Sequence, residues 1–176
     1  TTPPVRADTP KARVVRCEII CRNTRMGRIV CVANQKGGVG KTTTASNVAA
    51  GLAKAGMQTL LVDLDPQCNA TTGLGGLPAE THPLVSEAVL GENVVSTTVT
   101  NLSLLPGSRS VRDVERIAEQ ARAGSMVLSN HLSCGLNAWD YCLIDCPPSL
   151  GELTRTALAG STEVLMPIQC EYFALE

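Results

Sequence analysis

The 176-residue sequence contains very few aromatic residues, and this shortage limits the functions that it can have. Phe, Trp and Tyr make up 2% of the chain, at Trp139, Tyr141, Tyr172 and Phe173. The hydrophobic core must therefore be built from Val, Leu, Ile and Ala, and few rings are available to stack on single-stranded bases. The length predicts one domain with a sizeable buried core.

The sequence also lacks a long apolar run and an excess of basic residues in its main part. No run approaches the ~20 residues of a membrane-spanning helix, so we expect no contact with a membrane. Residues 1–28 carry seven basic and two acidic residues, whereas residues 29–176 carry eight basic and fourteen acidic ones. On charge alone, the main part is not a nucleic-acid-binding surface.

The sequence has eight cysteines but no C-x-x-C pair. Cys17 and Cys21, like Cys142 and Cys146, have a C-x₃-C spacing that is weak as a metal signature. Cys31 and Cys142 lie within apolar, strand-like runs. We interpret the cysteines as buried, reduced thiols of a cytosolic protein.

Residues 1–27 differ from the rest of the chain. They contain three prolines, scattered arginines and no periodicity, which predicts a basic, disordered extension. Such a segment could be an organelle leader or could bind an acidic surface. The interpretation that we favour is that Met26 is the true start, because "MGRIVCVANQKGG" reads as the beginning of a domain.

From residue 28 onward, short apolar runs alternate with helical patterns. Strands are expected at 28–34, 58–65, 101–108, 140–148 and 163–169, and helices at 41–56, 83–91, 111–124 and 152–160. Gly56 is a plausible stop for the helix that begins at Lys41. Strands that alternate with helices predict an α/β fold, in which a mostly parallel sheet is flanked by helices on both faces.

The segment "KGGVGKTT" lies between the first strand and the first helix, where a phosphate-binding loop is found. Its candidate nucleotide-binding residues are Lys36, Gly37, Gly38, Val39, Gly40, Lys41, Thr42 and Thr43. Glycines let backbone N–H groups approach phosphate oxygens, and the helix N-terminus adds a positive dipole end. Lys41 can reach the β- and γ-phosphates, and the Thr42 hydroxyl can coordinate Mg²⁺. Gln35 departs from the usual loop pattern, and Lys36 is an additional lysine.

Two of the expected strands end in aspartates. Asp63 and Asp65 end the second strand, and Asp145 ends the strand at 140–148. In an open α/β sheet, ligands bind at the carboxyl ends of the strands. We therefore expect Asp145 to hold Mg²⁺ through water, and either Asp63 or Asp65 to orient the attacking water.

Four segments closely resemble the ParA/Soj chromosome- and plasmid-partitioning ATPases, which carry a deviant Walker A loop. They are "ANQKGGVGKTTTASNVA", "LLVDLDPQCNATTGLG", "YCLIDCPPSLGELTRTAL" and "PIQCEYFALE", spread in order over residues 28–176. The resemblance implies a three-layer P-loop NTPase that binds ATP and Mg²⁺ as a sandwich homodimer and hydrolyses ATP slowly. It also implies non-specific DNA binding, a ParB/Spo0J-type centromere-binding partner and a cytoplasmic, nucleoid-associated location.

The resemblance also assigns roles to individual residues. In the loop, it makes Lys36 the lysine that crosses the dimer to the partner's phosphates, Lys41 the P-loop lysine that acts within its own subunit, and Thr42 a Mg²⁺ ligand. Of the aspartates, it makes Asp65 the residue that positions the hydrolytic water and Asp145 the Walker B residue. Asp63 matches the other strand-end acid of the family and is a further candidate metal ligand.

The chain ends at Glu176, where family members continue, so residues 28–176 match the N-terminal part of the ATPase domain and the fold is expected to be incomplete at the C-terminus. The adenine-contacting and DNA-binding residues of the family would lie beyond this point. The arginines that remain are best interpreted as a solvated helix face: Arg109, Arg112, Arg116 and Arg122.

Three other functions fit parts of the sequence. A MinD-like cell-division ATPase shares the loop but matches "DLDPQCNAT" less well. A nitrogenase-iron-protein-like electron carrier needs cluster cysteines, which Cys134 and Cys146 do not obviously supply. A truncated nucleotide-binding module would bind ATP without turnover.

Overall fold

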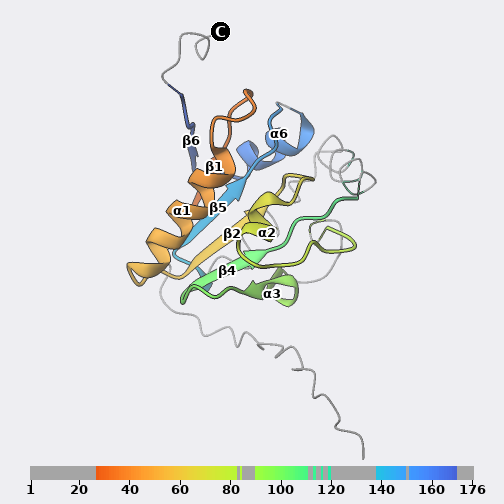
Figure 1. Cartoon of the computed structure of the whole chain (residues 1–176). Coiled ribbons are helices and arrows are strands. Elements are labelled where there is room, and N and C mark those ends of the chain that lie inside the picture. The colour runs from red at the N-terminus through yellow and green to blue at the C-terminus, as the bar shows by residue number, and fades with distance from the viewer. Residues whose placement is uncertain are drawn as a thin grey trace, which may run out of the picture.

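A computed structural model describes residues 27–82, 84, 90–110, 113, 116, 119, 138–149 and 151–169, without the side chains at 90 and 91. Within these residues the chain forms one sheet with the strand order β3-β4-β2-β5-β1-β6. The strands are β1 (Arg28–Val32), β2 (Thr59–Asp63), β3 (Val95–Ser96), β4 (Leu102–Leu105), β5 (Tyr141–Asp145) and β6 (Glu163–Leu165). Only the short edge strand β3 is antiparallel to its neighbour, so the expected mostly parallel sheet is confirmed (Figure 1).

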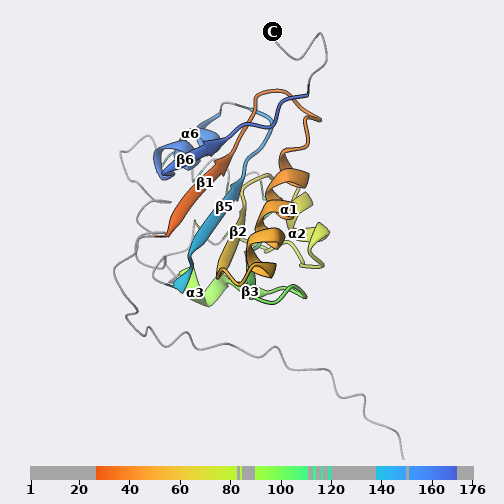
Figure 2. The same ribbon diagram turned by 90° about the vertical axis from the view of Figure 1, so that its left-hand side faces the viewer.

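Helices cover both faces of the sheet, which gives the expected three layers (Figure 2). Helices α1 (Lys41–Lys54) and α2 (Asn69–Gly73) lie on one face, and α6 (Glu152–Ala159) lies on the other. The helix α3 (Leu90–Asn93) leads into the edge strand β3. A hydrophobic core lies on each face of the sheet. The strands β1, β2, β4 and β5 each contribute to both cores, because the successive side chains of a strand point to opposite faces.

The packing of α1 depends on small residues. Ala45, Ala49 and Ala53 recur every four residues and are buried against Val32 and Leu61 of the sheet. Alanine side chains let the helix lie close to the strands, which brings its first turn near the strand ends. The helix ends as expected, since Gly56 adopts the left-handed φ of 91° that favours glycine.

The observed elements differ from the expected ones mainly at their ends. The strands β1, β2, β5 and β6 each end two to four residues earlier than expected, because the residues that follow leave the sheet to form loops. Helix α2 and strand β3 were not predicted, since "NATTG" has no apolar periodicity and β3 is two residues long. Of the expected helix at 83–91, only 84, 90 and 91 are described, and a helix runs from Leu90 to Asn93.

Other expectations fall largely outside the described residues. Positions 113, 116 and 119 are helical, in agreement with the helix expected at 111–124, whose other residues are not described. The extension at 1–26 and the start at Met26 are also outside the described part of the chain. No helix among the described residues is long and apolar enough to cross a membrane.

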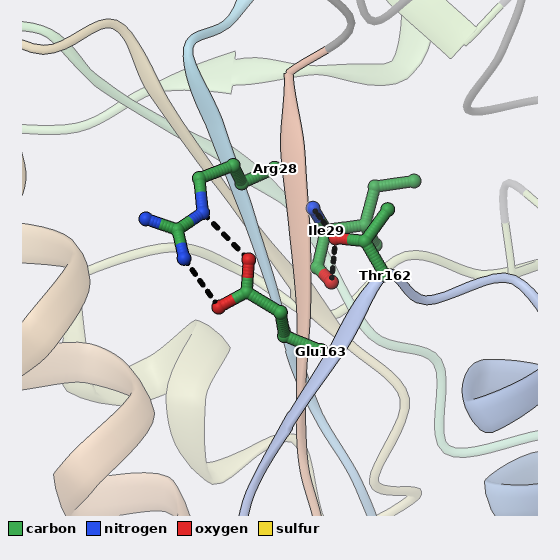
Figure 3. A network of polar contacts seen from close by, with 4 residues as sticks. All are labelled: Arg28, Ile29, Thr162 and Glu163. Carbon is green, nitrogen blue, oxygen red and sulfur yellow. Dashed lines mark hydrogen bonds and ion pairs between the residues drawn. The ribbon is translucent and has the colours of Figure 1, made fainter.

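Contacts at the start of β1 hold the edge strand β6 in place (Figure 3). The guanidinium of Arg28 donates to both carboxylate oxygens of Glu163, at 2.6 and 2.7 Å. The Thr162 hydroxyl accepts from the Ile29 N–H and donates to the Ile29 carbonyl, each at 3.0 Å. Because the ion pair is largely exposed, it adds little stability, but the contacts set the register in which β6 reaches the loop.

Candidate nucleotide-binding site

The glycine-rich loop follows the carboxyl end of β1 and is exposed at Gly37 and Gly38. Gly38 and Gly40 have φ angles of 75° and 84°, in the left-handed region that favours glycine. A Cβ atom added to Gly37, Gly38 or Gly40 would meet no atom within 4 Å, so the space above the backbone is free. Helix α1 begins directly after Gly40, and no side chain of the described residues caps its N-terminus. The N–H groups and the positive dipole end of the helix are therefore available to an anion.

Two polar side chains connect the loop to the segment that follows β6. The Asn34 side chain accepts from the Lys36 N–H and donates to the Pro167 carbonyl, each at 2.9 Å. Gln169 donates to the Gly38 carbonyl at 3.2 Å. Sequence analysis singled out neither residue, although Asn34 lies in "ANQKGGVGKTTTASNVA" and Gln169 in "PIQCEYFALE", two of the segments that carry the family resemblance. The loop shape therefore depends on a segment more than 130 residues away.

The two lysines of the loop occupy different environments. Lys41 is 6% exposed, and its Nζ donates to the Lys36 carbonyl at 3.1 Å. Its side chain therefore reaches back to the start of the loop. The side chain of Lys36 is exposed to solvent. The roles predicted for Lys36 and Lys41 stay predictions.

Asp145 is a buried carboxylate without a hydrogen-bond partner. Its side chain is 0% exposed, and neither carboxylate oxygen has a partner among the described residues. Burial raises the pKa of Asp145 from its ordinary 3.8 to about 7. The nearby Thr42 hydroxyl opposes this rise, although it is not placed as a full hydrogen-bond donor, while the charges of Asp63 and Asp65 add to the rise. A buried acceptor of this kind is costly unless a ligand completes it.

A magnesium ion fits this position. Mg²⁺ prefers oxygen ligands and commonly takes one or two from the protein, with phosphates and waters completing its shell. Thr42 and Asp145 offer a hydroxyl and a carboxylate beneath the loop, close enough for the hydroxyl to affect the acid. In the described part of the chain, no group of three or more His, Cys, Asp or Glu residues could hold a metal by itself. The residues thus fit a metal that arrives with a phosphate ligand.

Asp65 begins the turn that leads from β2 to α2. It is 7% exposed, and its Oδ1 accepts from the Gln67 N–H at 2.9 Å, as in an Asx turn. Its own N–H donates to Asp63 Oδ1 at 3.2 Å. The carboxylate therefore lies in a constrained turn at the same sheet edge as Asp145.

Asp63 pairs in register with Asp145 on the adjacent strand, but its carboxylate is hydrogen-bonded, whereas that of Asp145 accepts no hydrogen bond from the described residues. Its Oδ2 accepts from the N–H and the hydroxyl of Thr71, at 2.8 and 2.6 Å, and its Oδ1 accepts from Asp65. Burial raises the pKa of Asp63, although these hydrogen bonds oppose the rise. The metal-ligand role of Asp63 stays a prediction, and the structure gives its oxygens other partners.

The described cysteines are free thiols and buried, as expected: Cys31, Cys68, Cys142 and Cys146. The sulfurs of Cys31 and Cys146 lie 3.4 Å apart and share a hydrogen bond.

Arg109 and Arg116 are exposed, in agreement with a solvated face. The cysteines at 17, 21, 134 and 170 and the arginines at 112 and 122 lie outside the described residues.

Known proteins share this combination of fold and loop. Residues 27–176 match the model of a family described as the AAA domain. The chain belongs to this family. The chain is 44% identical over 156 residues to the sporulation initiation inhibitor protein Soj of Bacillus subtilis. The alignment covers 86% of the chain and 62% of Soj. The chain is 45% identical over 158 residues to the chromosome partitioning protein ParA of Myxococcus xanthus, covering 86% of the chain and 55% of ParA.

These identities confirm the ParA/Soj resemblance, and the AAA domain chain spans 55–62% of the length of the two relatives. A solved structure with the same fold is cobyrinic acid a,c-diamide synthase from Mycobacterium smegmatis with bound ADP and magnesium. The TM-score is 0.76 at 37% identity, over 85% of the AAA domain chain and 64% of the other. The names of these proteins differ, so the fold indicates a nucleotide site more directly than a cellular process.

Proposed function

We propose that the chain is a Mg²⁺-dependent ATPase of the ParA/Soj type, which acts as an ATP-gated dimer switch in chromosome or plasmid partitioning. The observation that carries the proposal is the buried, unpartnered Asp145, next to Thr42 and below an open glycine loop with Lys41 across it. The identity to Soj and ParA supports the partitioning role, and the ADP and magnesium in the solved relative support the ligand pair.

Each part of the site has a task in this proposal. The backbone amides of residues 37–43 and the start of α1 bind the phosphates, and Lys41 neutralises their charge. Thr42 and Asp145 hold Mg²⁺, which when bound offsets the charge that develops on the phosphates. Asp65 orients the attacking water, and Lys36 reaches the phosphates of a second subunit. Turnover is slow because the site is complete only in the dimer.

The proposed partners follow from the family. They are a second copy of the chain, a ParB/Spo0J-type centromere-binding protein that stimulates hydrolysis and, for the full-length proteins of the family, non-specific DNA. The proposed location is the cytoplasm, in association with the nucleoid.

Nucleotide binding and phosphate release by the purified chain test the proposal. We expect ATP to bind more tightly with Mg²⁺ than without it, and phosphate to be released slowly. Lys41→Ala is expected to weaken ATP binding, and Asp145→Asn to abolish the effect of Mg²⁺. Binding without phosphate release would instead favour a module without turnover, whereas a folded chain without Mg²⁺-dependent binding would refute the proposal. ATP-dependent binding to random duplex DNA, with its salt dependence, separates a partitioning role from a MinD-like one.

Asp65→Ala is expected to bind Mg²⁺ and ATP but to hydrolyse ATP about 10²-fold or more slowly, because the water loses its orienting carboxylate. The ATP-bound dimer should then accumulate, which light scattering after gel filtration measures. Glu92→Ala, which removes an exposed carboxylate on α3, is the control and should hydrolyse ATP normally. Rapid hydrolysis by Asp65→Ala would contradict the role assigned to this residue.

A further inference from the structure

The carboxylate of Asp63 is enclosed by donors from the protein itself. The side chain is 0% exposed, and both oxygens accept hydrogen bonds, one from Asp65 and two from Thr71. Its register partner Asp145 lies on the next strand, and its oxygens accept no hydrogen bond from the residues that the structure describes. The two aspartates at the carboxyl ends of adjacent strands therefore differ in hydrogen bonding. Among the described residues, both oxygens of Asp63 have donors and neither oxygen of Asp145 has one.

The Thr71 hydroxyl connects three separate segments. It donates to Asp63 Oδ2 at 2.6 Å and accepts from the Gly107 N–H at 2.9 Å. A hydroxyl has one hydrogen to donate and lone pairs to accept with, so both contacts form together. The hydroxyl thus joins the end of β2, helix α2 and the segment after β4.

Gly107 packs directly on Asp63, which closes this side of the carboxylate. A Cβ atom at residue 107 would lie 3.1 Å from Asp63 Cγ and 3.1 Å from Cys68 Sγ. A side chain at residue 107 would therefore be in tight contact with Asp63 and Cys68. This side of the Asp63 carboxylate is occupied by the protein itself.

His82 forms a hydrogen bond to the main chain of Asp63. Its Nδ1 accepts from the Leu84 N–H at 3.2 Å, so its Nε2 carries the hydrogen that it donates to the Asp63 carbonyl at 3.1 Å. The side chain is 4% exposed, and its backbone N–H donates to Asp113. Both the carboxylate and the carbonyl of Asp63 are thereby fixed.

We propose that Asp63 is a positioning residue that holds the Asp65 turn in place, with Thr71 as the residue that locks it, and that Asp63 does not bind the metal. This inference rests on the proposed function only for the step that Asp65 performs. Asp63 Oδ1 holds the N–H of Asp65, whose carboxylate begins the turn to Gln67. Displacement of this turn moves the water-orienting group, and a shift of about 1 Å in such a group costs about 10²-fold in rate.

Thr71→Val and Thr71→Ser form the test. Valine keeps the shape and removes the hydroxyl, whereas serine restores it. We expect Thr71→Val to reduce single-turnover hydrolysis about 10- to 100-fold, with ATP affinity and the half-saturating Mg²⁺ concentration within about threefold of the unaltered chain. Thr71→Ser should recover the rate to within about threefold. Hydrolysis unchanged in Thr71→Val, or equally reduced in both variants, would overturn the positioning role.

Asp63→Asn tests the other half of the proposal. It should leave the half-saturating Mg²⁺ concentration for ATP binding within about threefold, whereas Asp145→Asn should raise it about tenfold or more. An equal rise in both variants would identify Asp63 as a metal ligand and overturn the proposal.

Amide hydrogen exchange of the nucleotide-free chain keeps the inference separate from the proposed function. Thr71→Val should speed exchange at Asp65 and Gly107 about tenfold, since the acceptor at residue 71 is lost and the Asp63 carboxylate loses one of its three hydrogen bonds, and Thr71→Ser should not. If the unaltered chain does not hydrolyse ATP, the proposed function fails, while the exchange rates still decide whether Thr71 locks the turn. Unchanged exchange in Thr71→Val would overturn the lock.

Discussion

Lys36→Ala is expected to retain part of its ATP binding but to lose ATP-dependent dimerisation and to hydrolyse ATP about 10²-fold more slowly. A cation placed where phosphoryl charge spreads in the transition state acts as an arginine finger does, and such contacts contribute about 10³–10⁵ in rate in efficient enzymes. A smaller factor is expected for a slow switch. Lys41 should stay in place, because it contacts the main-chain carbonyl of residue 36 and not the side chain that is removed.

Lys54→Ala is the matched control, since it removes an exposed lysine from the last turn of α1, away from the loop. Binding is measured by titration with a fluorescent ATP analogue, dimerisation by light scattering and hydrolysis by phosphate release. Normal turnover by Lys36→Ala would refute the role in the partner's site.

A mixture of two inactive variants can show directly that Lys36 acts on the other subunit. In a mixed dimer of Lys36→Ala and Asp65→Ala, the site of the first subunit keeps Asp65 and receives Lys36 from the second. The mixture should therefore hydrolyse ATP faster than either variant alone. If Lys36 acted within its own subunit, neither site of the mixed dimer would be complete, and no gain would follow.

The residues that the sequence predicted are those whose chemistry has a fixed local pattern. Gly38, Gly40 and Lys41 were predicted from strand–loop–helix spacing. The two glycines have left-handed φ angles and Lys41 donates to the Lys36 carbonyl, while their role in phosphate binding stays a prediction. Thr42 and Asp145 were also expected at one place, because the carboxyl ends of parallel strands meet the first turn of the following helix.

The residues that the sequence did not predict act through contacts between distant segments. Asn34 and Gln169 join the loop to the chain after β6, and Thr71 joins α2 to Gly107. Hydrogen bonds of this kind have no spacing rule, so composition and periodicity carry no signal for them. The difference between Asp63 and Asp145 also arises from distant contacts. Both aspartates end a strand and are buried, but Asp63 is hydrogen-bonded to Thr71, whereas Asp145 accepts no hydrogen bond from the described residues.

Asp145→Asn is expected to make the nucleotide-free chain more stable than the unaltered chain at neutral pH. The pKa of Asp145 is about 7 in the folded chain and ordinarily 3.8, so between these values the folded chain holds a proton that the unfolded chain has released. Folding stability therefore falls as pH rises through this window, by about 1.4 kcal/mol per pH unit at most. Asparagine has no charge to bury, so the variant should lack this part of the pH dependence.

Mg²⁺ and ATP should reverse the order of stability. Ligand that binds only the folded chain raises its unfolding free energy by RT ln(1 + [L]/Kd), and the unaltered chain should receive this gain in full. The variant should receive little, because its amide offers no negative oxygen to the metal. Urea unfolding between about pH 5 and pH 8, with and without Mg²⁺ and ATP, measures both effects. Glu92→Gln, an exposed acid, is the control and should follow the unaltered chain. Parallel pH curves for Asp145→Asn and the unaltered chain would contradict the raised pKa of Asp145. Equal stabilisation of both by Mg²⁺ and ATP would show that the buried carboxylate is not the metal site.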